Sequence, residues 1–271
     1  MCEFCISHGE GKKWYENMTN YSRELFLKVN SDAGLKDFLG RFGQSMHDNI
    51  PRAEKWKNRL PRIYDFLVYP WLTRYQKKSH FGQIVPLEGI EKVLDRVDTV
   101  IRLPCICRRV ATGVEKRCCY AVGMDTSHII EDLPDFRDFD KISAAIAKEE
   151  IGGLDRQGMT HSVWTFNTPF IGAICNCDHD CMAYRVQYKS KLATVMWKGE
   201  YVAEIEVEKC NGCRLCRKQC VFEAIRYDPA DKKCLVEPGA CYGCGICRAV
   251  CPGEAITLLP REEISRAAGN W

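Results

Sequence analysis

The chain has 271 residues, enough for one large or two modest domains with a normal core. Its 39 Lys and Arg residues nearly balance its 36 Asp and Glu residues, which leaves a net charge of +3. This balance argues against a nucleic-acid-binding surface. No stretch reaches the length of about eighteen apolar residues that is typical of a membrane-spanning helix.

Eighteen cysteines far exceed ordinary usage, and they indicate either extracellular disulfides or intracellular metal ligands. The first residues, MCEFC, lead into a charged segment without the apolar run of a secretory signal. We therefore expect a cytoplasmic protein whose cysteines bind metal, from a host that could be anaerobic. Cys2 and Cys5 form a first Cys-x-x-Cys pair. They could join a metal site, bind metal with a partner chain, or have no ligand role.

Apolar residues at helical spacing predict a helix over residues 22–30 and another through 35–42. Pro51, Pro61 and Pro70 then favour a series of short helices rich in aromatic and basic residues. Residues 60–78 could form a membrane-surface helix. The prolines interrupt its amphipathic stripe, so we expect core and partner contacts there instead of membrane contact.

A helix opening at Pro86 precedes a buried strand over 99–103, which leads directly into Cys105-Ile106-Cys107. Cys118-Cys119 comes eleven residues later. A helix is expected over 142–149, a turn at Gly152-Gly153, and a strand over 161–166.

The stretch FIGAICNCDHDCMAYR, residues 170–185, contains a third cysteine group and an Asp178-His179-Asp180 insert. Apolar or glycine-containing runs flank all three groups, which places them near a core, and their cysteines are enough for one four-ligand site or for two sites. His179 is expected beside the site or at the surface, since enough thiolates are present without it. The candidate ligands are Cys105, Cys107, Cys118, Cys119, Cys175, Cys177 and Cys181.

Thiolate-rich sites select iron–sulfur clusters or zinc. We expect a third iron–sulfur cluster at this site, with a structural zinc ion or unmetallated buried cysteines as the alternatives.

The C-terminal part contains an internal repeat, after a predicted hairpin over 191–208 that turns at Lys198-Gly199. CNGCRLCRKQCVFEAI (210–225) aligns with CYGCGICRAVCPGEAI (241–256). Three cysteines at two-residue gaps can wrap one cubane cluster, and a fourth after a longer gap can reach a second cluster. A zinc ribbon is the alternative, but it normally uses two Cys-x-x-Cys pairs.

With this spacing, residues 200–260 resemble a bacterial-type two-cluster ferredoxin. The resemblance implies one [4Fe-4S] cluster on Cys210, Cys213, Cys216 and Cys251, and another on Cys241, Cys244, Cys247 and Cys220. Cys234 fits neither set and is expected as a buried or partly buried free thiol. The preceding part is similar, more loosely, to an N-terminal domain of some anaerobe oxidoreductase subunits, in which the elements CICR, RCCYAVG and ICNC recur in this order.

We therefore predict an α+β protein with a mostly helical, cysteine-rich domain over residues 1–199 and a two-cluster ferredoxin-like domain over 200–271. The predicted function is to relay low-potential electrons between a redox donor and a partner oxidoreductase, within a larger complex. The alternative is a redox enzyme whose N-terminal site is catalytic, an idea that depends on the Asp178-His179-Asp180 insert. A redox or metal sensor ranks last, because no output domain is recognisable.

Overall fold

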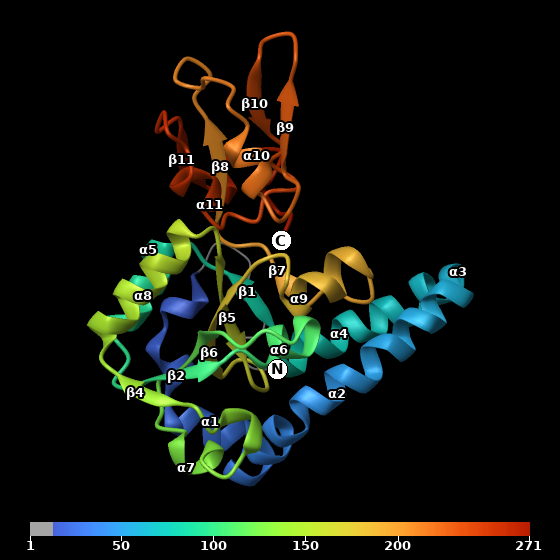
Figure 1. The fold of residues 1–271 in the computed structure, drawn as a ribbon, viewed down its shortest axis with the longest axis vertical. Helices are drawn as coiled ribbons and strands as arrows, with labels where there is room; N and C mark the ends of the chain where they lie inside the picture. Colours follow the sequence, from blue (N-terminus) through green and yellow to red (C-terminus); the bar gives the residue numbers. More distant parts are fainter. Residues whose placement is uncertain (1–12) are drawn as a thin grey trace.

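The structure is a computed structural model that describes residues 13–271, and it combines α-helices with β-sheets (Figure 1). Cys2 and Cys5 lie outside the described residues. No helix in the described part of the chain is both long and apolar enough to cross a membrane.

A seven-stranded sheet forms the centre of the N-terminal part. Neighbouring strands are antiparallel, except that β1 and β7 are parallel. The sequence predicted two of these strands; the others are very short or rich in Gly, Ala and Cys, which weakens a strand pattern. In spatial order the strands are β4 (Asp140–Ile142), β2 (Val100–Pro104), β3 (Arg117–Val122), β6 (Ile171–Cys177), β5 (Thr160–Thr165), β1 (Gly82–Ile84) and β7 (Met196–Trp197).

Helices cover both faces of this sheet. Because successive side chains of a strand point to opposite faces, Tyr120 and Ile174 pack toward α5 (Leu87–Leu94) and α8 (Ala144–Arg156). Gly152 and Gly153 lie inside α8, so the turn expected there is wrong. The short 3₁₀ turns η2 (Trp14–Glu16) and η3 (Met18–Tyr21) complete this layer.

On the opposite face, Ile101, Ala121 and Phe170 pack against a second helical layer. Its elements are α1 (Arg23–Val29), α2 (Asp32–Arg59), α6 (Ile106–Thr112), α7 (Ser127–Ile130) and η5 (Pro134–Phe136).

The helix α2 forms a long hairpin with α3 (Pro61–Ile63), the π-helical turn η4 (Tyr64–Val68) and α4 (Tyr69–Ser79). The hairpin extends well beyond the sheet (Figure 1). Short proline-punctuated helices were expected here, and the expectation is wrong in part. Pro51 lies inside α2, and Pro61 and Pro70 occupy first-turn positions, where a missing backbone N–H costs little.

The C-terminal part forms two small antiparallel sheets with two short helices. The hairpin predicted over 191–208 is wrong, because β7 pairs with β1 while β8 pairs with the distant β11. The paired strands are β8 (Tyr201–Ile205) with β11 (Ile256–Pro260), and β9 (Ile225–Asp228) with β10 (Lys233–Val236). The helices are α10 (Leu215–Gln219), α11 (Ile246–Ala249) and the turn η7 (Arg261–Glu263); α9 (Met182–Tyr184) and the π-helical turn η6 (Arg185–Lys189) precede β7.

Candidate metal centre

All seven candidate cysteines of the N-terminal part lie around one end of the central sheet. Strand order explains why, because β2, β3 and β6 are neighbours and each carries or leads into a cysteine pair. Cys119 of β3 stands directly opposite Cys175 of β6 in the strand register. Cys105 and Cys107 follow β2 at the start of α6, and Cys181 precedes α9.

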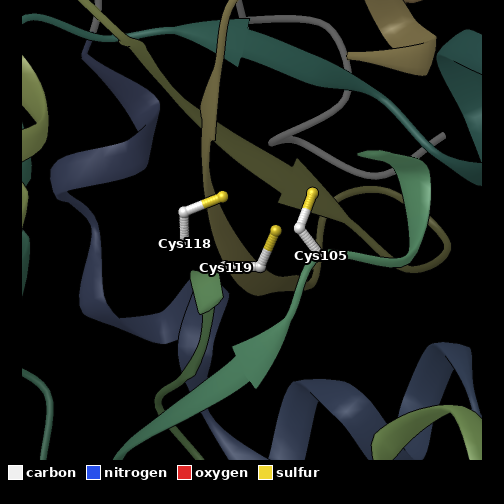
Figure 2. A group of neighbouring side chains, drawn as sticks. All are labelled: Cys105, Cys118 and Cys119. Carbon is white, nitrogen blue, oxygen red and sulfur yellow. The ribbon is translucent and has the colours of Figure 1, made fainter. Parts of the chain in front are cut away.

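Three thiols form the tightest group. The Sγ atoms of Cys105, Cys118 and Cys119 all lie within 4.8 Å of one another and could hold a metal ion. Figure 2 shows them gathered from β3 and from the chain just after β2. A tetrahedral zinc ion with bonds of about 2.3 Å keeps its sulfur ligands roughly 3.8 Å apart. The observed spacing is therefore compatible with a single ion. Cys175 extends this group through a hydrogen bond to Cys119.

The remaining three thiols form a second group beside the first. The Sγ atoms of Cys177 and Cys181 are 3.0 Å apart, and Cys107 is hydrogen-bonded to Cys181. The cysteines thus divide into a four-thiol group (Cys105, Cys118, Cys119 and Cys175) and a three-thiol group (Cys107, Cys177 and Cys181).

Each group contains one thiol that ionises easily. Hydrogen bonds from Cys118 and Cys119 lower the pKa of Cys105 to about 3. Hydrogen bonds from Cys107 and Cys177 lower the pKa of Cys181 to about 5. The same hydrogen bonds raise the thiol pKa values of the donors Cys107, Cys118 and Cys177. A thiolate surrounded by further thiols is the donor set that soft metals select.

The acidic insert does not supply metal ligands in this arrangement. Asp178 and Asp180 contact the buried guanidinium of Arg108, at 2.7 Å and 3.5 Å. His179 is exposed and packs edge-on against Tyr184. Arg108 also donates its backbone N–H to Cys105. The insert therefore holds the guanidinium of Arg108 beside the thiols, and its carboxylate oxygen atoms are engaged in these two ion pairs.

A buried polar chain that the sequence analysis missed supports the strand carrying Cys118. Asn176 donates from Nδ2 to the Cys118 carbonyl oxygen at 2.7 Å, so its Oδ1 faces Nδ1 of His161. That nitrogen must then carry a hydrogen, and Nε2 of His161 lies 3.1 Å from Oδ1 of Asp155. The alternating strand pattern places both residues on the face opposite the cavity described below, which was the available signal.

An apolar cavity of about 770 Å³ adjoins the cysteines. It lies between the hairpin α2–α4 and the sheet, and six of the seven cysteines line it. Aromatic side chains such as Phe42, Trp164 and Phe166 form much of its wall. His80 also lines it, and burial lowers the pKa of its imidazole to about 4.

In the C-terminal part, Cys251 from the second repeat lies with Cys210, Cys213 and Cys216 around one small cavity. Cys220, Cys241, Cys244 and Cys247 interact electrostatically as a second group. Cys234 is buried, as expected for a free thiol. Its place was not foreseen: it is hydrogen-bonded to Cys216 and lines the first cavity.

The two repeats have matching backbone geometry. Gly212 and Gly243 have φ values of +72° and +74°, and a Cβ on either would overlap a backbone carbonyl oxygen. The N–H groups of Ala224 and Ala255 point at the sulfur atoms of Cys220 and Cys251, at 3.3 Å and 3.4 Å. The equivalence in sequence therefore extends to the contacts made with sulfur.

An aromatic stack connects the two parts of the chain. Tyr184, just after Cys181, stacks on Tyr188 at 5.3 Å between ring centroids. Tyr188 packs against Phe222 at 5.7 Å, and Phe222 stacks on Tyr242 at 4.1 Å. Phe222 and Tyr242 follow Cys220 and Cys241 closely in sequence.

No known protein-family model matches this chain, and no curated protein is significantly similar to it in sequence.

Proposed function

We propose that this protein is an iron–sulfur electron-transfer protein or subunit, which relays low-potential electrons between a redox donor and a partner oxidoreductase. One observation carries the proposal: the fourth cysteine of the second repeat lies with the first triplet. A fourth cysteine that joins the triplet of the other repeat is typical of two-cluster ferredoxins. Zinc ribbons instead use two Cys-x-x-Cys pairs. Each cluster would have four cysteine ligands and would transfer single electrons without an open position for substrate.

This chain would hold the clusters and set their potentials. In the proposal, Cys210, Cys213, Cys216 and Cys251 bind one [4Fe-4S] cluster, and Cys241, Cys244, Cys247 and Cys220 bind the other. The N–H groups of Ala224 and Ala255 donate to ligand sulfur, and such hydrogen bonds tune cluster potential.

The four-thiol group would hold a third centre. A third iron–sulfur cluster suits the relay, because zinc has no redox chemistry. The compact spacing of Cys105, Cys118 and Cys119 is also compatible with a structural zinc ion. The aromatic stack from Tyr184 to Tyr242 would hold this centre and the second ferredoxin-type cluster in a fixed relation.

Metal analysis after anaerobic purification tests the proposal. We expect about twelve irons per chain for three cubane clusters, or about eight with one zinc if the N-terminal centre is structural. Cys251→Ser should remove about four irons. Cys234→Ser is the matched control, since Cys234 lines the same cavity, and it should leave the iron content unchanged. Equal iron loss in both variants, or zinc as the main metal, would contradict the proposal.

A second candidate function is a redox enzyme that acts at the three-thiol group. A metal with three protein ligands keeps an open position, whereas a four-ligand site is closed. Cys107, Cys177 and Cys181 face the apolar cavity, and Asp178 and Asp180 are bound to Arg108. An apolar substrate could therefore reach a metal bound there, while the ferredoxin-type clusters supply electrons.

The two candidates differ in their response to a small metal ligand. We would add tert-butyl isocyanide, an apolar molecule that coordinates open metal positions, to the reduced protein and record EPR spectra. The enzyme proposal predicts a changed spectrum in the wild type and a weaker change in Phe42→Trp, which narrows the cavity. An unchanged wild-type spectrum would contradict the catalytic role and remain consistent with electron transfer alone.

A further inference from the structure

The outer part of the helical hairpin has an unusual concentration of exposed apolar side chains. Seven of the twelve large exposed apolar side chains in residues 13–271 lie between residues 56 and 75. Phe66 is 79 % exposed and Trp71 is 63 % exposed. Rings this exposed gain little from packing, and a contiguous group of them marks a candidate interaction surface. The seven are Trp56, Leu60, Ile63, Phe66, Leu67, Trp71 and Tyr75.

Most of these side chains form a stripe along the second arm of the hairpin. Ile63, Leu67, Trp71 and Tyr75 recur at intervals of four residues, and the rings of Trp71 and Tyr75 stack at 6.0 Å. Phe66 lies between Ile63 and Leu67 and adds to this stripe, and Leu60 marks the turn that separates α2 from α3.

The same segment is strongly basic, although the whole chain is nearly neutral. Residues 50–79 contain eight Lys or Arg and two Asp or Glu, a net charge of +6 against +3 for the entire chain. The remainder is therefore net negative. Both acidic residues are already paired, Glu54 with Arg185 and Asp65 with Lys57.

Seven of the eight basic side chains are exposed and form no ion pair with any residue between 13 and 271. Their charge is thus available to an external anionic surface. They are Arg52, Lys55, Arg59, Arg62, Arg74, Lys77 and Lys78.

Contacts with the body hold this surface in place. Tyr64 donates its hydroxyl hydrogen to the carbonyl oxygen of Leu192 at 3.2 Å, and Tyr69 is hydrogen-bonded to Thr194 at 2.8 Å. Arg185 binds Glu54 through both its Nε and Nη2 atoms. The hairpin is therefore anchored to the body through these three side chains, while Phe66, Leu67 and the seven basic side chains remain exposed. Trp71 and Tyr75 are also largely exposed and border the mouth of the apolar cavity.

We propose that this hairpin surface docks the protein on an anionic lipid membrane. Exposed Trp, Phe and Leu side chains beside unpaired Lys and Arg match the chemistry of interfacial helices: the apolar groups enter the headgroup boundary and the cations bind acidic lipids. Trp and Tyr favour this interface because their rings are amphipathic. Pro61 and Pro70 do not interrupt this segment, because both occupy first-turn positions and α3, η4 and α4 follow one another without a gap.

Vesicle flotation of the anaerobically purified full chain tests this proposal. Vesicles of phosphatidylcholine with phosphatidylglycerol should retain the protein at low salt and release it as ionic strength rises, because screening shortens the reach of charge. Vesicles of phosphatidylcholine alone should retain far less. Equal retention by both vesicle types, or no retention by either, would overturn the proposal.

Two sets of variants separate the hairpin from general stickiness. Phe66→Ser with Leu67→Ser should reduce the partition coefficient by about tenfold or more, because two apolar side chains no longer enter the lipid. Arg62→Glu with Lys78→Glu should weaken binding to anionic vesicles alone. Ile146→Ser with Val114→Ser is the matched control, since both are about half exposed and lie outside the hairpin.

Circular dichroism and the visible absorption of the clusters check that each variant folds. If the wild type ignores anionic vesicles while the hairpin variants lose a co-purifying protein, the surface is a protein interface and the membrane proposal is wrong.

Discussion

At the scale of single residues, Gly212 and Gly243 in the loops of the repeat leave no room for a side chain. Gly212 has a positive φ, and an added Cβ would overlap the carbonyl oxygen of Lys232. Any side chain at this position thus meets both backbone strain and a backbone atom that cannot rotate away. The loop can adopt this conformation only because this position is glycine.

Gly212→Ala is expected to reduce iron content by about four per chain, because the first ligand loop can no longer close. Gly113→Ala is the matched control: its φ is +75°, yet nothing lies within 4 Å of an added Cβ. The control should lose about 1 kcal/mol of stability from strain alone and keep its iron. Iron and sulfide analysis measures the first effect and thermal unfolding the second; iron loss in both would contradict the steric explanation.

His80 should make stability depend on pH. Its ring packs among Phe38, Phe42, Trp164 and Phe166, and burial lowers its pKa from 6.5 to about 4. Below pH 6.5 the unfolded chain binds a proton that the folded chain excludes. The folded state therefore loses stability as pH falls from 6.5 to 4, by about 3 kcal/mol in total.

Urea unfolding of the wild type and of His80→Phe across this pH range measures the effect. The difference between the two proteins should shrink toward neutral pH, where His80 is neutral in both states. A difference that stays constant with pH would show that His80 does not titrate as described.

At the scale of elements, α6 is joined to the loop after β6 by one buried cation. Arg108 is only 5 % exposed and binds both Asp178 and Asp180. This contact fixes the approach of Cys105 and Cys107 to Cys177 and Cys181. The neighbouring Arg109 instead binds Asp135 and Glu115.

Arg108→Gln should release the metal of the N-terminal centre and leave about eight irons, since two carboxylates then stand unpaired near thiolates. Arg109→Gln removes an equal charge from the adjacent position and should retain the full metal content. Metal analysis and EPR of both variants make the comparison. Full retention in Arg108→Gln would show that the acidic insert is not needed for this centre.

At the scale of the whole molecule, the two parts differ in what forms their cores. Aromatic and aliphatic side chains pack both faces of the large sheet. The C-terminal core, in contrast, contains four buried cysteines together with few large apolar side chains. Small units with such cores are commonly stabilised by cross-links, and the proposed clusters would supply them here.

Removal of iron with a chelator and an oxidant should therefore unfold the C-terminal part first. Limited proteolysis followed by mass spectrometry should show early cleavage within residues 200–271, while the sheet of the N-terminal part stays protected. Wild-type holoprotein under the same conditions is the reference. Simultaneous cleavage in both parts would mean that the N-terminal part depends on metal to the same degree.

The sequence by itself predicted the cysteine sets and determined several elements. The repeat is local, so spacing alone indicated which cysteines could share a site and which glycines the loops require. The buried strand β2, the helix α5 and the strand β5 also follow from local periodicity, with ends shifted by a residue or two. Local periodicity succeeds where one element carries its own pattern over enough residues.

Only the tertiary structure decided how these pieces meet. The partition of seven thiols into groups of four and three depends on which strands are neighbours in the sheet, and strand order is not encoded in any local pattern. Three further contacts join residues far apart in sequence: β8 pairs with β11, Cys234 lies beside Cys216, and Arg108 forms an ion pair with Asp178. The exposed stripe of the hairpin belongs to the same class, because a pattern of apolar residues cannot tell which face the rest of the chain will cover.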